Sequence, residues 1–150
     1  MLTIGELALF MEKQAAHARH GLLEVTHHLM KAVATDAKAL IGHELDRWPP
    51  LADGTVAEKL LLGYVGHISA TDPLLRTGDM RETIKHHAEL TATGAEGVVG
   101  SGSKIALDQE MGTKHIPPRP FLAEAMAQIE PKARHEIELF GAALLRPPIV

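Results

Sequence analysis

The chain has 150 residues, of which 45% are hydrophobic and 23% charged, values that are typical of a folded globular domain. Cysteine is absent, which excludes disulfide bonds, thiolate metal ligands and cysteine nucleophiles. Aromatic residues make up 3% of the chain and the formal net charge is −4 at pH 7, so the composition favours neither a base-stacking site nor a basic nucleic-acid surface.

The first residues and the apolar runs bear on targeting. The opening contains Glu6 and Glu12 and lacks a basic n-region, and no apolar run reaches the length of about 18 residues that a membrane span needs. We expect a protein without membrane association, made in the cytoplasm. We also expect one domain over residues 1–150, with a helical region at 1–45, a core at 46–125 and a C-terminal helix at 126–150.

Apolar residues recur in steps of three and four from Thr3 to about His43, which predicts a long amphipathic helix. They are Leu7, Met11, Leu22, Val25, Leu29, Val33 and Leu40. Gly21 would permit a bend or a break inside this helix, and Gly42 is a stop signal at its end.

Turn-forming residues dominate the stretch from Asp46 to Thr55, in which Trp48 and Leu51 are candidates for anchoring against the core. A short helix from Val56 to about Leu62 and a loop from Gly63 to Pro73 are predicted next.

The middle of the chain contains the strand signals. Thr77 is a good N-cap, which predicts a short helix through Met80 and Ile84. The alternation after Lys85, a turn at Thr93 and Gly94, and a valine pair predict a β-hairpin that ends at Ser101.

Helices and an arm are predicted for the rest. Ile105 to Glu110 should form a brief helix ended by Gly112, and the proline-rich stretch from His115 to Pro120 an extended arm or a loop. Phe121 to Leu145 is rich in helix formers, with Pro131 at a kink or a boundary between two helices. The expected fold class is therefore α+β: a long N-terminal helix and C-terminal helices packed with a small antiparallel sheet.

Four of the ten histidines, His17, His20, His27 and His28, lie in the first predicted helix. Glu24 and His27 have the Glu-x-x-His spacing of di-iron bundles, but such a bundle needs a second copy of the motif. At about 100° per residue the four histidines lie opposite the leucine and valine stripe, which favours a polar face exposed to solvent or to a partner. The alternative hypothesis is a histidine-rich helical metal-binding protein.

The glycine-rich segment from Gly97 to Lys104 matches neither the Walker pattern nor the dinucleotide fingerprint. We interpret it as a strand end or flexible loop that suits the close approach of a neighbouring subunit. No serine-hydrolase or zinc-protease motif is present in the sequence. We therefore expect no enzyme activity, no cofactor and no metal site.

Three segments occur in order: WPPLAD at 48–53, followed by Thr55 and Lys59; PLLRTGDMR at 73–81; and QEMGT at 109–113, followed by IPPRPFL at 116–122. Together they resemble the tail-component family of long-tailed phages, described as tail-completion, neck or head-tail joining proteins. The virion morphogenesis proteins of Mu-like phages are similar. The resemblance covers roughly residues 45 to 125.

The resemblance implies a structural virion protein at the head-tail junction, acting through interfaces. Its partners would be copies of itself in a ring, a hexamer or dodecamer, with a head-completion protein on one side and the tail tube or tail terminator on the other. DNA would pass through without specific binding, because an acidic ring repels phosphates. The implied interaction residues are Trp48, Leu75, Arg76, Thr77, Gly78, Asp79, Arg81, Glu110, Gly112, Pro118, Arg119, Pro120 and Phe121.

Overall fold

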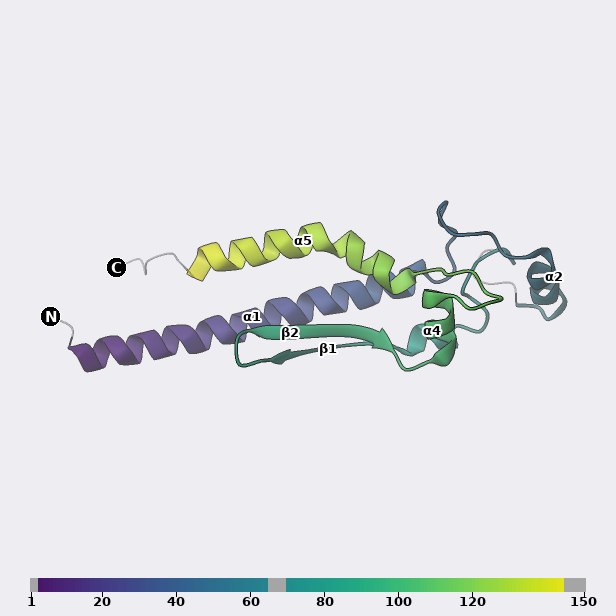
Figure 1. The fold of residues 1–150 in the computed structure, drawn as a ribbon. Helices are drawn as coiled ribbons and strands as arrows, with labels where there is room; N and C mark the ends of the chain where they lie inside the picture. The colour runs from purple at the N-terminus through teal and green to yellow at the C-terminus, as the bar shows by residue number, and fades with distance from the viewer. Residues whose placement is uncertain (1–2, 65–69, 145–150) are drawn as a thin grey trace.

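A helix of 37 residues, α1, runs along most of the elongated molecule (Figure 1). The computed structural model describes residues 3–64 and 70–144. The elements follow in the order α1 (Ile4–Leu40), α2 (Asp53–Leu61), α3 (Asp79–Glu82), β1 (Ile84–Leu90), β2 (Ala95–Ser101), α4 (Lys104–Met111) and α5 (Phe121–Leu144). Helix α5 packs along one side of α1, and the hairpin of β1 and β2 packs along another. The predicted α+β fold and the long first helix are confirmed.

A capping box begins α1. The Thr3 hydroxyl accepts the Glu6 N–H at 3.2 Å, and the Glu6 carboxylate accepts the Thr3 N–H at 2.8 Å. The Thr3 N–H and the Thr3 hydroxyl both donate to the Glu6 carboxylate, each at 2.8 Å, and these two hydrogen bonds lower the pKa of Glu6. The first turn of α1 is therefore fixed by local contacts, as the sequence of its first residues allows.

Two glycines, Gly21 inside α1 and Gly42 just beyond its end, lie against other parts of the chain. The helix continues through Gly21, and a Cβ at this position would lie 2.6 Å from Cε2 of Phe140, so the glycine makes room for α5. Beyond the end of α1, Gly42 adopts a φ of 92°, and its N–H donates to the Pro73 carbonyl at 3.0 Å. The predicted stop at Gly42 is confirmed, whereas the break at Gly21 is wrong.

The core lies where α1, α5 and the hairpin meet. Its buried residues come from the second half of α1 (Leu29, Val33, Ala34, Ala37), from the start of α5 (Phe121, Ala125, Ile129), and from Ile41, Trp48, Leu75, Ile84 and Ala106. The anchoring predicted for Trp48 is confirmed, since only 7% of its surface is exposed.

The predicted hairpin is confirmed. Strands β1 and β2 pair antiparallel from Ile84 opposite Ser101 to Leu90 opposite Ala95. The glycine-rich segment is a strand end over its first part, as one of the two interpretations has it, because β2 runs to Ser101. A Cβ at Gly97 would lie 2.4 Å from Cγ of Met30, so the close approach that this glycine permits is to α1 of its own chain.

We therefore expect Gly97→Val to destabilise the protein by about 1–3 kcal/mol, because the added side chain must push β2 away from Met30. Gly100→Val is the matched control in the same strand, since a Cβ there meets nothing within 4 Å. Chemical denaturation of both variants measures the difference. Equal stability of the two would contradict close packing of β2 on α1.

Other boundaries differ from the predictions. The predicted helix after Thr77 is one turn long, with Gly78 as its N-cap at φ 92°, because Ile84 already belongs to β1. Helix α2 begins at Asp53, three residues before the predicted start. Pro131 lies inside a continuous α5 and marks no boundary between helices. Of the loop predicted up to Pro73, residues 65–69 lie outside the described residues.

No helix within residues 3–64 and 70–144 is long and apolar enough to cross a membrane.

Candidate functional site

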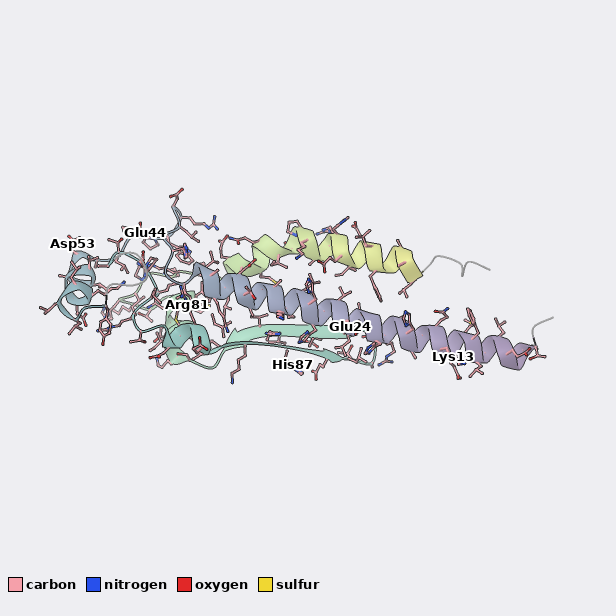
Figure 2. The ribbon with its side chains drawn as sticks, turned by 180° about the vertical axis from the view of Figure 1, so that it is seen from behind. Lys13, Glu24, Glu44, Asp53, Arg81 and His87 are labelled. Atoms are coloured by element: carbon pink, nitrogen blue, oxygen red, sulfur yellow. The ribbon has the colours of Figure 1, made fainter. Side chains whose placement is uncertain are left out.

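The three motif segments come together at one end of the molecule, opposite the beginning of α1. Figure 2 shows Asp53 and Arg81 at this end and Lys13 at the other. Side chains of all three segments line one cavity of about 650 Å³. Its lining includes Leu51 and Lys59 of the first segment, Leu74 and Arg76 of the second, and Ile116 and Arg119 of the third.

Arg119 joins the third segment to the first. Arg119 is 4% exposed, and its guanidinium donates to the Pro49 carbonyl, at 2.8 Å from Nη2 and 3.2 Å from Nε, and to the Pro50 carbonyl at 3.2 Å. Its backbone N–H donates to the Gln109 carbonyl at 2.7 Å. Desolvation lowers the pKa of Arg119, and a guanidinium remains charged at neutral pH even so. Arg119 therefore positions two loops of the cavity wall.

Glu110 caps the last helix. Its two carboxylate oxygens accept the N–H groups of Leu122 and Ala123, both at 2.9 Å, in the first turn of α5. A carboxylate at this position also complements the positive end of the helix dipole. The third motif segment thereby fixes where α5 begins.

Replacing Glu110 with alanine is expected to lower the free energy of unfolding by about 1–2 kcal/mol, the usual cost of losing a helix cap. Glu130→Ala is the control in α5, because its side chain is 68% exposed and pairs only with Arg134 among the described residues. Thermal melting followed by circular dichroism compares the two. An unchanged melting temperature for Glu110→Ala would rule out a stabilising cap.

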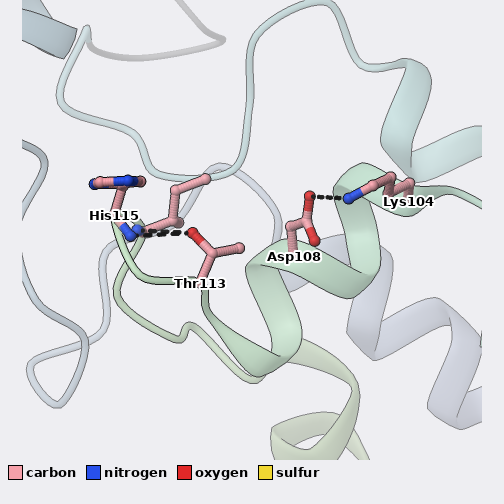
Figure 3. Close-up of polar contacts among 5 residues, drawn as sticks. Lys104, Asp108, Thr113 and His115 are labelled. Atoms are coloured by element: carbon pink, nitrogen blue, oxygen red, sulfur yellow. Dashed lines mark hydrogen bonds and ion pairs between the residues drawn. The ribbon is translucent and has the colours of Figure 1, made fainter.

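The proline arm folds onto its own chain. Gly112 has a φ of 74°, and a Cβ there would lie 2.9 Å from Cδ of Pro118. The turn that follows is closed by the Thr113 N–H, which donates to the Ile116 carbonyl at 2.8 Å. Figure 3 shows the same turn, with the Thr113 hydroxyl accepting the His115 N–H at 3.2 Å. After the arm and Pro120, Phe121 is fully buried in its own core.

The second segment has strained and close-packed backbone. Leu74 is the one residue other than glycine with a positive φ, 64°, among the described residues. Its neighbour Leu75 is buried and packs over Gly42, whose Cβ would lie 2.8 Å from Cδ2 of Leu75. Arg81 donates to the Ile41 carbonyl, which ties this segment to the end of α1.

The charged residues of the cavity wall are engaged with their own chain. Arg76 pairs with Glu58 at 2.7 Å and lies 5.0 Å from the centre of the Tyr64 ring. The Thr77 hydroxyl donates to the Asp79 carboxylate at 2.7 Å. These contacts therefore occupy charged and polar groups of the cavity wall within the chain itself.

Lys59 and Asp72 form a buried contact that the sequence did not reveal. The Lys59 ammonium donates to the Asp72 backbone carbonyl at 2.7 Å. Desolvation lowers the pKa of Lys59, and the charge of Asp72 partly opposes that shift. A lysine in a short helix is not expected to be buried. The one sequence feature that pointed to Lys59 was its place in the first motif segment.

The histidines of α1 point to different partners. All four predicted as exposed are exposed. His20 lies 3.2 Å from Glu24 of its own helix, His28 lies 3.8 Å from Glu136 of α5, and the His27 ring lies 5.2 Å from the His86 ring of β1. In the parts of the chain that the structure describes, no group of three or more His, Asp or Glu side chains is placed to hold a metal ion.

No protein-family model, curated protein or solved structure matches this chain. The fold and the cavity at the motif end are therefore the observations on which a functional proposal depends.

Proposed function

We propose that this chain is a structural protein of the phage particle at the head-tail junction, a tail-completion or neck component. The observation that carries the proposal is the meeting of the three ordered motif segments around one cavity. The first and third segments are far apart in the sequence but are hydrogen bonded to each other through Arg119 and the Pro49 carbonyl. A resemblance spread over unrelated surfaces would carry less weight than one concentrated on a single site.

The chemistry of the cavity favours an interface. Its wall combines apolar side chains with charged groups that are already paired or hydrogen bonded. A protein surface that presents apolar side chains inside a polar rim is typical of protein-protein contacts. The proposed neighbours are further copies of the chain in a ring of six or twelve, a head-completion protein, and the tail tube or tail terminator.

The acidic balance of the chain supports a role around DNA without binding it. With a formal net charge of −4, a ring of copies would repel the phosphates of DNA that passes through. A ring structure with a strongly basic channel lining would contradict this part of the proposal.

The test is the composition and assembly of particles made from the gene cluster that encodes the chain. Quantitative mass spectrometry should find a fixed number of copies per particle, and deletion of the gene should leave heads and tails unjoined in electron micrographs. Normal joined particles after deletion would overturn the proposal.

Two point variants of α4 connect that test to the cavity. Ile105 is 65% exposed and lines the cavity, whereas Leu107 is 60% exposed and lies outside its lining. Both variants should fold, and Ile105→Glu should reduce the yield of joined particles while Leu107→Glu should not. An equal effect of both would exclude the cavity as the contact surface.

A further inference from the structure

In the described part of the chain the sheet has two strands, so each strand has one edge without a neighbouring strand. Along an antiparallel strand, the backbone groups of alternate residues point to the partner strand and those of the residues between them point away. The Thr91 N–H donates to the Gly94 carbonyl at 2.9 Å. Counted back from this pair, His86, Ala88 and Leu90 direct their N–H and C=O groups away from β2. Within residues 3–64 and 70–144, no other residue is hydrogen bonded to these groups.

The open part of the β1 edge runs from His86 to Leu90. Ile84, the first residue of β1, is 2% exposed, and α3 packs against this end of the strand. At the other end, Leu90 is 40% exposed although it shares the face of the sheet that packs on α1. The strand has no proline and no bulge, and Figure 1 shows it along the lower margin of the molecule. A regular edge of this kind is a template for another strand.

The outer face of β1 carries charges of both signs. Lys85, His87 and Glu89 alternate with the residues that face α1, and the side chains of His87 and Glu89 are 72% and 66% exposed. Charged residues on an edge strand usually keep other strands away. A second copy of β1 placed antiparallel is complementary instead, because its glutamate then lies beside the basic side chains of the first.

We propose that two copies of the chain pair through β1, which joins their hairpins into one antiparallel sheet of four strands. The register that uses the whole open edge is centred on Ala88. Ala88 then pairs with Ala88 of the other copy, and His86 of each copy pairs with Leu90 of the other. Between these hydrogen-bonded pairs, His87 lies opposite Glu89 of the other copy, with both side chains on the outer face.

The helices leave room for such a sheet. Thr26 and Met30 lie against Gly97 of β2, and the His27 ring lies 5.2 Å from the His86 ring of β1, so α1 covers both strands. In the joined sheet the midlines of the two hairpins are two strand spacings apart, about 9.6 Å. Packed helices lie about 8–10 Å apart, so the two copies of α1 fit side by side. Helix α5 lies on the other side of α1 from the hairpin (Figure 1).

The pairing goes beyond the proposed function, because it uses the hairpin and not the cavity at the motif end. The three hydrogen-bonded pairs exchange about six backbone hydrogen bonds. In strand addition these bonds supply the affinity, so the contact needs little apolar surface. A surface that meets the same surface of a second copy is two-fold symmetric, and the contact stops at a dimer. Such pairs are compatible with the proposed ring of twelve.

The absence of cysteine from the sequence makes disulfide trapping a direct test. His87→Cys and Glu89→Cys would be made as two separate full-length chains, mixed, and treated with oxidised glutathione. Opposite residues of a non-hydrogen-bonded pair are close enough for a disulfide. We expect the mixed product to exceed either homodimer several-fold. Glu96→Cys on the outer face of β2 is the control and should give no product with His87→Cys.

A second measurement tests the backbone hydrogen bonds. Ala88→Pro removes the N–H at the centre of the pairing but none from the hairpin, because this N–H points away from β2. Ala88→Gly keeps the N–H and is the matched control. In sedimentation velocity of concentrated protein, Ala88→Gly should form dimers and Ala88→Pro should not. Circular dichroism checks that both variants fold.

Three results would overturn the inference. They are a mixed disulfide no more abundant than the homodimers, a product between His87→Cys and Glu96→Cys, and dimers of Ala88→Pro as abundant as those of Ala88→Gly. A chain that stays monomeric and gives no mixed disulfide would do the same. All of these results concern the purified chain, so they leave the proposed function, which is tested on particles, unaffected.

Discussion

Phe121→Ala is expected to lower the free energy of unfolding by about 3–5 kcal/mol, which makes it one of the most damaging single changes in the chain. Phe121 has no exposed surface and belongs to the same buried cluster as Val33 and Ile41. Truncation removes buried apolar area and leaves a cavity where the motif arm enters α5. Because Phe121 directly follows the proline arm in the third motif segment, we also expect the arm to loosen.

Urea denaturation measures this change, and the chain supplies a control of the same chemistry. Phe10 lies near the beginning of α1 with 47% of its surface exposed, so Phe10→Ala should change the stability of the chain by no more than about 0.5 kcal/mol. Similar losses for the two variants would mean that the beginning of α1 is packed in solution or that Phe121 is not in the core.

Arg119→Met is the second large effect, expected at about 2–3 kcal/mol. The substitution keeps much of the apolar stem but removes three hydrogen bonds from a charged donor to the carbonyls of Pro49 and Pro50. Arg119→Lys should recover only part of the loss, because an ammonium cannot reproduce the forked geometry of a guanidinium.

The control for Arg119 is Arg134→Met in α5. Arg134 is 70% exposed and pairs with Glu130 one turn away, an ion pair worth less than about 0.5 kcal/mol. Denaturation midpoints at equal m-value compare the two arginines. If Arg119→Met were as harmless as Arg134→Met, the link between the first and third motif segments would not contribute to stability.

The local sequence pattern was enough to predict the first helix, the hairpin and the last helix. The stripe of α1, the alternation and turn of the hairpin, and the composition of α5 each repeat over many residues, and all three elements are present. The short helix after Thr77 was extended too far because the periodic signal through Ile84 does not distinguish a helix end from the first residue of a strand.

Long-range packing was not visible in the same way. The local sequence at Gly21 permits a bend or a break in the helix. In the structure this glycine makes room for Phe140, which lies far along the chain. The three segments that line the cavity could be picked out in the sequence, but the hydrogen bonds between them could not be predicted. Arg119 reaches the Pro49 carbonyl across 70 residues, and nothing in the sequence around either residue encodes that bond.

The capping box at Thr3 matters beyond the first turn, because every residue from Ile4 to His17 is exposed. A helical segment without tertiary packing is marginal in water, so its order depends on local contacts such as those of Glu6. The lowered pKa of Glu6 means that this contribution is present near neutral pH and is lost as the pH falls below its usual 4.5 and through the lowered value. Amide hydrogens of residues 4–17 should therefore exchange more quickly than those in the rest of α1, and the difference should be larger in acid.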